Sequence, residues 1–315
     1  MPHRTYNTAM PTLAMSATRR RSIEANLFPF AQPAVEPWAA FRWHAATGES
    51  CDTWKEHSSQ ALAIDVFGTL KLHPQRDAIL DALARELGLP AGGPWAVDLE
   101  WHDPDNRLRE KTPTFVDAVA RSPRTLIVFE CKFSENDGGT CSQTRPLPTG
   151  RRQGLRQCNG HYVPQVNPAN KLEARCALSA KGIAYWDVIP DVFGYSAETS
   201  VAPCPFAGPW FQWMRNLTTA YAVAQRHDLR AAFVMAYADG PGLAMAQRVQ
   251  STDWQWLRNR VDPARVAFRA MSIQHLLHLA GLVAGDDPVW HDLTGWVKRK
   301  IDSVCGGSLA ARQVE

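Results

Sequence analysis

No stretch of this sequence is long and apolar enough to cross a membrane, and no apolar signal core follows the first methionine. We therefore expect a cytoplasmic protein without a membrane partner. Triplet and heptad repeats are also missing, which excludes collagen-like structures and long coiled coils. Neither charge sign dominates, because 34 Lys and Arg against 31 Asp and Glu leave a net charge of +3. That balance neither demands nor forbids a polyanionic partner.

Several familiar active-site signatures are missing as well. The sequence has no Walker loop, no G-x-G-x-x-G motif and no G-x-S-x-G elbow. It also has no C-x-x-C pair, although four of its seven cysteines follow one another in one region: Cys141, Cys158, Cys176 and Cys204. Four thiols could bind zinc or an iron–sulfur cluster, but structural zinc sites usually contain a C-x-x-C pair. We therefore favour separate thiols and keep a metal centre as the alternative.

The chain divides into a basic N-terminal segment and a globular remainder. Residues 1–35 carry several Arg and no acid before Glu24, and we interpret them as a disordered tail, with a basic arm that contacts nucleic acid phosphates as the alternative. Residues 36–315 are expected to form a single domain. Its composition, 45% hydrophobic and 21% charged, is ordinary for a globular protein.

Hydrophobic periodicity predicts an α/β class, because helices precede and follow a block of strands. Helices are expected at 58–70, 75–88 and 210–227, and in three segments after residue 250. Strands are expected at 95–101, 114–120, 125–133 and 231–239, and residues 181–189 fit either a strand or a helix. Residues 134–175 have few apolar side chains and predict a long loop.

Two acids and a lysine fall on a predicted hairpin within this block. If the hairpin loop is Ser122 to Thr125, Arg121 faces Leu126, and counting back places Asp117 opposite Glu130. Directly opposed side chains have Cβ atoms about 5 Å apart. Two carboxylates at that distance repel unless a cation lies between them, and Mg²⁺ or Mn²⁺ would suit such a site.

The neighbouring lysine adds a possible catalytic group. Lys132 lies two residues after Glu130 in a strand, so both side chains point to one face, while Cys131 points to the other. From that face, Lys132 could orient or deprotonate a water molecule. The spacing alone favours a surface Glu–Lys pair, and metal-assisted hydrolysis is the alternative that the features around this motif support.

Asp117 followed by Glu130-Cys131-Lys132 resembles the motif of the PD-(D/E)XK nuclease superfamily, with Val116 in place of the proline. The resemblance implies a restriction-endonuclease-like mixed β-sheet flanked by helices. It implies Asp117, Glu130 and the Cys131 backbone carbonyl as metal ligands, and Lys132 as the catalytic lysine. Glu100, on the preceding strand, resembles an additional upstream acid that binds a second metal or orients a water.

Two further segments resemble a restriction-endonuclease-like bacterial group. One is the Ser59-Gln-Ala helix, and the other is a helix carrying Gln212, Arg215 and Asn216. The resemblance implies that Gln212 supports the lysine or contacts nucleic acid. Arg215, one turn further on, could bind a phosphate. A helix cap and a surface Arg paired with a carboxylate are the alternatives.

The loop after Lys132 is basic. Between 142 and 175 it has six Lys and Arg against one acid, a net charge of +5, and we expect Arg151, Arg152 and Arg156 to contact a polyanion. These features together predict a Mg²⁺- or Mn²⁺-dependent endonuclease acting on DNA, with RNA also a possible substrate. The alternative is a non-cleaving nucleic-acid-binding or defence accessory module on the same fold.

Overall fold

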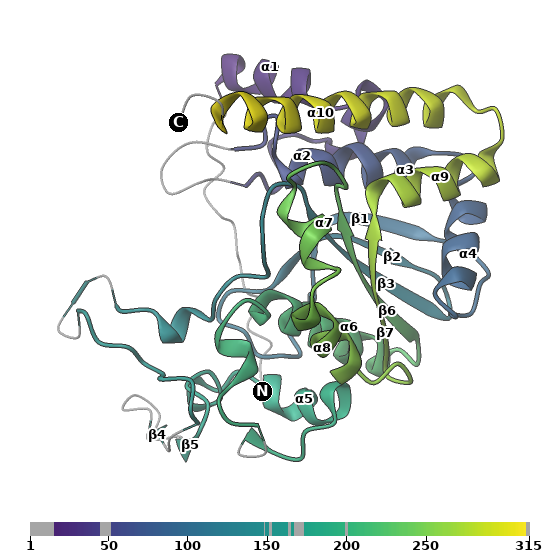
Figure 1. Ribbon diagram of the computed structural model, residues 1–315. Coiled ribbons are helices and arrows are strands. Elements are labelled where there is room, and N and C mark those ends of the chain that lie inside the picture. Colours follow the sequence, from purple (N-terminus) through teal and green to yellow (C-terminus); the bar gives the residue numbers. More distant parts are fainter. Residues whose placement is uncertain are drawn as a thin grey trace.

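The computed structural model describes residues 16–44, 52–147, 149–150, 153–162, 165–166, 173–198 and 201–312. A five-stranded sheet with the order β1-β2-β3-β6-β7 lies between two layers of helices (Figure 1). Its strands are β1 (Ala96–His102), β2 (Phe115–Arg121), β3 (Thr125–Lys132), β6 (Arg230–Tyr237) and β7 (Val266–Ser272). β1, β2 and β3 pair antiparallel, whereas β3, β6 and β7 pair parallel. The mixed sheet flanked by helices confirms the predicted fold class.

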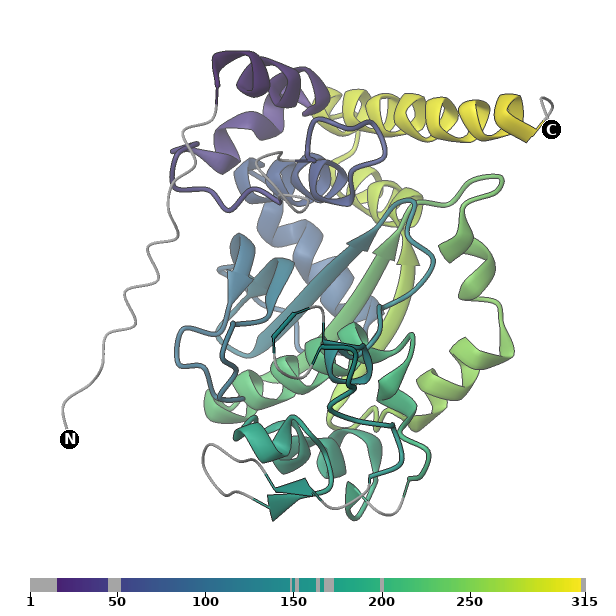
Figure 2. The same ribbon diagram turned by 90° about the vertical axis from the view of Figure 1, so that its left-hand side faces the viewer.

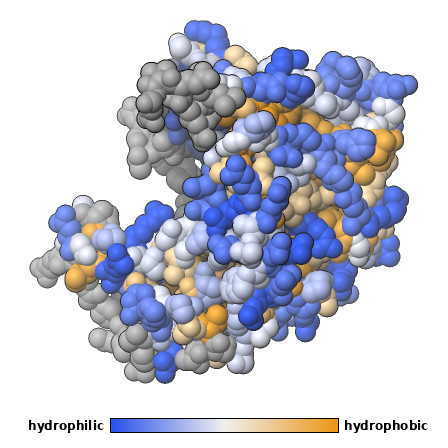
Figure 3. Space-filling model, viewed as in Figure 1, coloured by the Kyte–Doolittle hydropathy of each residue, from blue (hydrophilic) through white to orange (hydrophobic). Residues whose placement is uncertain are grey.

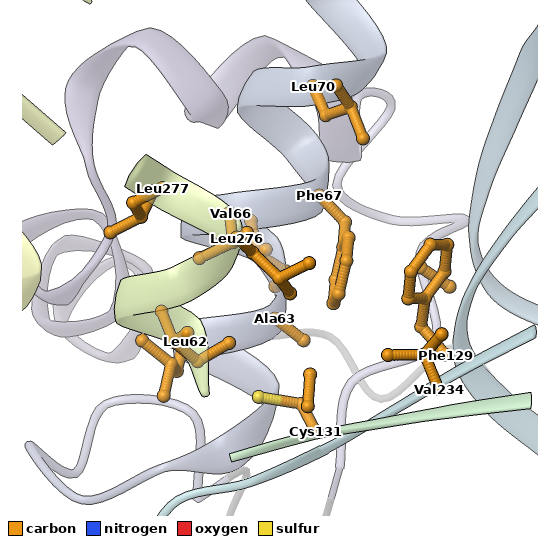
Figure 4. Close-up of a cluster of buried hydrophobic side chains, with 14 of the residues drawn as sticks. Leu62, Ala63, Val66, Phe67, Leu70, Phe129, Cys131, Val234, Leu276 and Leu277 are labelled. Carbon is orange, nitrogen blue, oxygen red and sulfur yellow. The ribbon is translucent and has the colours of Figure 1, made fainter. Parts of the chain in front are cut away.

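One face of the sheet is covered by helices from both ends of the chain. They are α2 (Ser59–Ala63), the π-helical turn η2 (Ile64–Gly68), α3 (Thr69–Leu72), α4 (Arg76–Glu86), α9 (Ile273–Ala284) and α10 (Pro288–Arg312). Figure 4 shows how Phe67 of the π-helical turn reaches the sheet, where its ring centroid lies 4.5 Å from that of Phe129. The segment predicted as one helix from 58 to 70 is thus helical throughout, with a π turn at its centre.

The opposite face is covered by four helices. They are α5 (Tyr185–Phe193), α6 (Phe211–Arg226), α7 (Ala244–Arg248) and α8 (Thr252–Arg260). Helix α6 buries Trp213 and Leu217 completely and packs on β3 and β6. Burying those side chains fixes the rotation of α6, and therefore the direction in which its polar residues face the end of β3.

The N-terminal segment is ordered where we expected a disordered tail. Residues Ala17–Asn26 form α1 and Pro29–Val35 form the 3₁₀ helix η1, which lie beside α10 (Figure 2). Ile23 and Leu27 are 0% exposed within the main core. The expectation is wrong for residues 17–35, because apolar side chains among the arginines complete this core. Residues 1–15 lie outside the described residues.

The end of the sheet also differs from the sequence expectation. One of the helical segments expected after residue 250 covers residues 268–283, but Val266–Ser272 form β7 and the helix begins only at Ile273. Val266 and Phe268 alternate with Ala267 between the two faces of the sheet, which is the strand period that a helical interpretation misses. Within the described chain, no helix has the length and apolarity needed to span a membrane.

Residues 134–209, named the lobe from here on, connect β3 to α6. Around β4 and β5 the lobe extends away from the body of the molecule, whereas α5 packs against α6 (Figures 1 and 3). Its described elements are short: a two-stranded sheet of β4 (Gln165–Val166) and β5 (Glu173–Ala174), the helix α5, and the 3₁₀ turns η3 (Ser142–Thr144), η4 (Ser179–Lys181) and η6 (Pro205–Ala207). The predicted long loop is therefore irregular for most of its described length.

Candidate functional site

Asp117 lies where the two strands of the hairpin separate. The observed register pairs Arg121 with Leu126, as the hairpin count predicts, and the described pairing continues to Ala118 and Phe129. One residue further, the Cys131 N–H donates to the Asp117 carboxylate instead, with N and Oδ2 2.6 Å apart. At the end of the β-ladder, the Asp117 carboxylate thus accepts the Cys131 N–H in place of a backbone carbonyl. This hydrogen bond holds the carboxylate beside β3.

Glu100 reaches the same place from β1. The register of β1 on β2 pairs Leu99 with Ala118 and Trp101 with Val116, which places Glu100 between them, level with Asp117. Glu100 has a φ of 48°, a left-handed conformation that costs a non-glycine residue about 1–2 kcal/mol. Such strain is typical of functional sites, and here it accompanies an acid directed toward a second acid.

A histidine completes a cluster of three potential metal ligands. One ligand atom each from His44, Glu100 and Asp117 lies within 4.8 Å of the other two. Glu100 and Asp117 are buried, at 8% and 7% exposure, while His44 is exposed. The structure therefore brings together the predicted Glu100 and Asp117. It adds His44, which no sequence pattern had indicated.

Gln60 and Arg42 hold this cluster in position. The Gln60 amide donates to Glu100 Oε1 at 2.6 Å and accepts the His44 backbone N–H at 2.9 Å. Arg42 Nη1 lies 3.1 Å from Glu100 Oε2. Gln60 belongs to the Ser-Gln-Ala segment noted in the sequence, so that motif marks a residue that orients the acid and the histidine.

The electrostatics of the cluster favour a bound cation. Burial raises the pKa of Asp117 well above its usual value, and the Glu130 and Glu100 carboxylates raise it further. Partial desolvation of the His44 imidazole, whose side chain is 45% exposed, lowers its pKa, but the Glu100 hydrogen bond and charge outweigh this effect and raise the pKa overall. Both shifts reflect an excess of negative charge in a low-dielectric place, which a divalent ion would neutralise.

Glu130 and Lys132 form a second, adjoining group that faces α6. Lys132 Nζ lies 3.0 Å from Glu130 Oε1 and 2.9 Å from Gln212 Oε1, and the Gln212 amide donates to the same Glu130 oxygen at 2.5 Å. Asn216 donates to the other Glu130 oxygen at 2.8 Å. Glu130 therefore contacts the lysine, and a direct metal bond through it or through the Cys131 carbonyl stays a prediction.

The charge of Lys132 is maintained by its neighbours. Burial lowers its pKa, but Glu130, Glu135 and Asp117 outweigh burial and raise the pKa above the usual value. Glu135, which sequence reasoning missed, accepts hydrogen bonds from Ser59 and from the Phe133 N–H. Burial raises the pKa of Glu135, but Lys132 and Ser59 lower it overall. The lysine is thus an ammonium held by the Glu130 carboxylate and the Gln212 amide, and the charge of Glu135 favours it further.

Arg215 lies away from this group, in a buried network of its own. Its guanidinium donates to Thr114 Oγ1 at 2.6 Å, to the Tyr185 hydroxyl at 2.9 Å and to Glu110 at 3.3 Å. These contacts favour a structural role over the predicted phosphate contact. Arg156 is exposed on the lobe, whereas Arg151 and Arg152 lie outside the described residues.

Comparison with known proteins adds a family to this geometry. The family model described as "Restriction Endonuclease associating with ARP" matches residues 40–293, which include all the residues of the acidic cluster and the lysine group. No curated protein and no solved structure gave a significant match. Because the match spans most of the chain and the mixed sheet fits a restriction-endonuclease-like domain, this protein belongs to the family of restriction endonucleases associating with ARP.

Proposed function

We propose that the protein is a metal-dependent nuclease of the PD-(D/E)XK type that hydrolyses phosphodiester bonds in DNA. One observation carries the proposal: three adjacent strands bring Glu100, Asp117 and the charged amine of Lys132 to one end of the sheet. Buried acids without a full set of donors are costly to maintain unless they have a function.

The donor set fits a divalent ion. Asp117 and Glu100 would hold it through carboxylate oxygens, which Mg²⁺ and Mn²⁺ prefer, and the His44 imidazole suits Mn²⁺ as well. A bound ion would polarise a phosphoryl oxygen and acidify a water molecule. Gln60 would keep Glu100 and the His44 backbone in position for binding.

Lys132 would position the attacking water and stabilise the negative charge that develops on the phosphate. Glu130 and Gln212 fix its ammonium group, so little reorganisation is needed when the substrate arrives. DNA would lie across this end of the sheet, and exposed basic residues of the lobe such as Arg156 would contact its backbone.

The test is a cleavage assay on labelled DNA and RNA with Mg²⁺, with Mn²⁺ or with EDTA. The proposal extends to this chain the association with ARP that the family's description names, so cleavage is assayed with and without that partner. We expect cleavage that requires the metal and falls by at least about 10²-fold in Lys132→Ala. Lys298→Ala, which removes an exposed lysine of α10, is the matched control.

Equal cleavage by the parent and Lys132→Ala would contradict the proposal. Salt-dependent DNA binding without cleavage under any of these conditions would also contradict it, and would indicate a non-cleaving nucleic-acid-binding module instead.

A further inference from the structure

Four cysteines of the lobe come from segments far apart in the sequence, yet backbone hydrogen bonds join these segments. The Cys158 N–H donates to the Gln143 carbonyl at 2.9 Å, and the Cys141 N–H donates to the Ala207 carbonyl at 3.2 Å. The Cys204 N–H donates to the Gly160 carbonyl at 2.6 Å. Cys141, Cys158 and Cys204 are therefore held within one small part of the lobe.

Cys176 joins the other three through Tyr162. Its neighbour Arg175 donates to the Tyr162 carbonyl at 3.3 Å, and the Tyr162 hydroxyl donates to the Cys204 sulfur at 2.9 Å. The segment that carries Cys176 is therefore joined to Tyr162 and, through its hydroxyl, to Cys204.

Two of the sulfurs accept hydrogen bonds within this part of the lobe. The Gly160 N–H donates to the Cys158 sulfur at 3.3 Å, and the Tyr162 hydroxyl donates to the Cys204 sulfur. Hydrogen bonds to sulfur favour the thiolate, which is the metal-binding form, and they tune metal–sulfur centres.

We propose that Cys141, Cys158, Cys176 and Cys204 form a four-thiolate site that holds zinc or an iron–sulfur cluster. Four sulfur ligands are typical of these two centres. Tetrahedral zinc with bonds of about 2.3 Å requires sulfurs about 3.8 Å apart. Among the described residues, no three of these sulfurs lie within 4.8 Å of one another, so the sulfurs would have to move closer together to bind a single zinc ion.

The site would stabilise the lobe beside the candidate active site. The Gly138 N–H donates to the Pro209 carbonyl at 2.8 Å, and the Gln212 N–H donates to the Gly138 carbonyl at 2.7 Å. The base of the lobe is thus bonded to the start of α6, which carries the Gln212 side chain that contacts Lys132. A metal centre that joins four segments of the lobe would order it, since metal binding in such small units is coupled to folding.

The test is metal analysis of the full-length protein purified without oxygen and without chelators. We expect either about four iron atoms with matching sulfide and absorbance near 400 nm, or about one zinc without colour. Cys176→Ala should lose at least half of the metal, while Cys305→Ala, which removes a buried thiol of α10, should retain it.

A second measurement does not depend on variants that fold. In the parent protein, the four lobe thiols should resist alkylation until a chelator is added, and then react. Less than about 0.1 metal per chain after reconstitution with iron and sulfide or with zinc would overturn the proposal. Immediate alkylation of all four thiols in the metal-loaded protein would overturn it as well. Neither measurement requires nuclease activity.

Discussion

Asp65 and Asp117 are both buried and both have raised pKa values, but their surroundings are opposite. Asp65, in the π-helical turn, accepts from the Phe28 N–H at 2.6 Å, from the Trp296 indole at 3.0 Å and from Lys300 at 2.6 Å. Asp117 accepts from the Cys131 N–H, and burial together with the Glu130 and Glu100 carboxylates around it outweighs the nearby His44 and Lys132, so its pKa is raised. A compensated carboxylate joins elements of the fold, whereas an uncompensated one marks a place for a cation.

The largest expected effect is the loss of stability when Asp65, the compensated carboxylate, is removed. Asp65→Ala should lower the free energy of unfolding by about 3–5 kcal/mol, because it leaves the buried Lys300 ammonium without its partner. Urea denaturation followed by circular dichroism measures this change. Asp302→Ala, which removes an exposed acid of α10, should change the stability by less than about 0.5 kcal/mol. Equal effects would mean that the Asp65 ion pair does not stabilise the fold.

Stabilisation by a bound metal should depend on Asp117, the uncompensated carboxylate, and not on Asp65. Mg²⁺ at 100 times its dissociation constant should raise the free energy of unfolding by about 2.7 kcal/mol. Mg²⁺ is the suitable probe, because oxygen ligands bind it and thiolates do not prefer it. Asp117→Asn should abolish this stabilisation. A variant stabilised as much as the parent would place the ion elsewhere.

Gln60, which orients Glu100, should contribute less to metal affinity than the acids themselves. Gln60→Ala should weaken Mn²⁺ binding by about 10–100-fold, since it removes the amide that holds Glu100 and the His44 backbone. Calorimetric titration gives the dissociation constant. Gln250→Ala, at an exposed position, is the control. An unchanged constant for Gln60→Ala would exclude Glu100 from the metal site.

The smallest expected effect is a gain in the free energy of unfolding when the Asp117 charge is removed from the metal-free protein. Because the folded-state pKa of Asp117 lies above its unfolded value, the metal-free native state loses stability as the pH rises from the usual carboxyl range through that raised pKa. At pH 8, metal-free Asp117→Asn should therefore be more stable than the parent, by about 0.5–1 kcal/mol. At pH 4 or below the difference should shrink. A less stable variant at pH 8 would mean that the repulsion among the acids is compensated in the native state.

The parts of the site that follow from local rules were predictable. The hairpin loop set the register that places Asp117 beside β3, and strand alternation placed Glu130 and Lys132 on one face. Helical spacing placed Gln212 on a helix, but only packing brought it to Lys132.

His44 and Glu135 were not predictable, because tertiary packing brings their loops to the sheet and no periodicity marks them. The N-terminal helix was missed for the same reason: Ile23 and Leu27 become core residues only against the rest of the fold. The absence of C-x-x-C likewise says nothing about four thiols contributed by four separate segments.

The most direct test of the metal site is anomalous diffraction from crystals of the protein soaked in Mn²⁺. The account predicts an anomalous peak bounded by the carboxylates of Asp117 and Glu100, with His44 or Glu130 as the next nearest side chain. Asp117→Asn crystals should lose the peak under the same conditions. A peak in the parent that avoids both acids, or no peak at this end of the sheet at saturating Mn²⁺, would contradict the account.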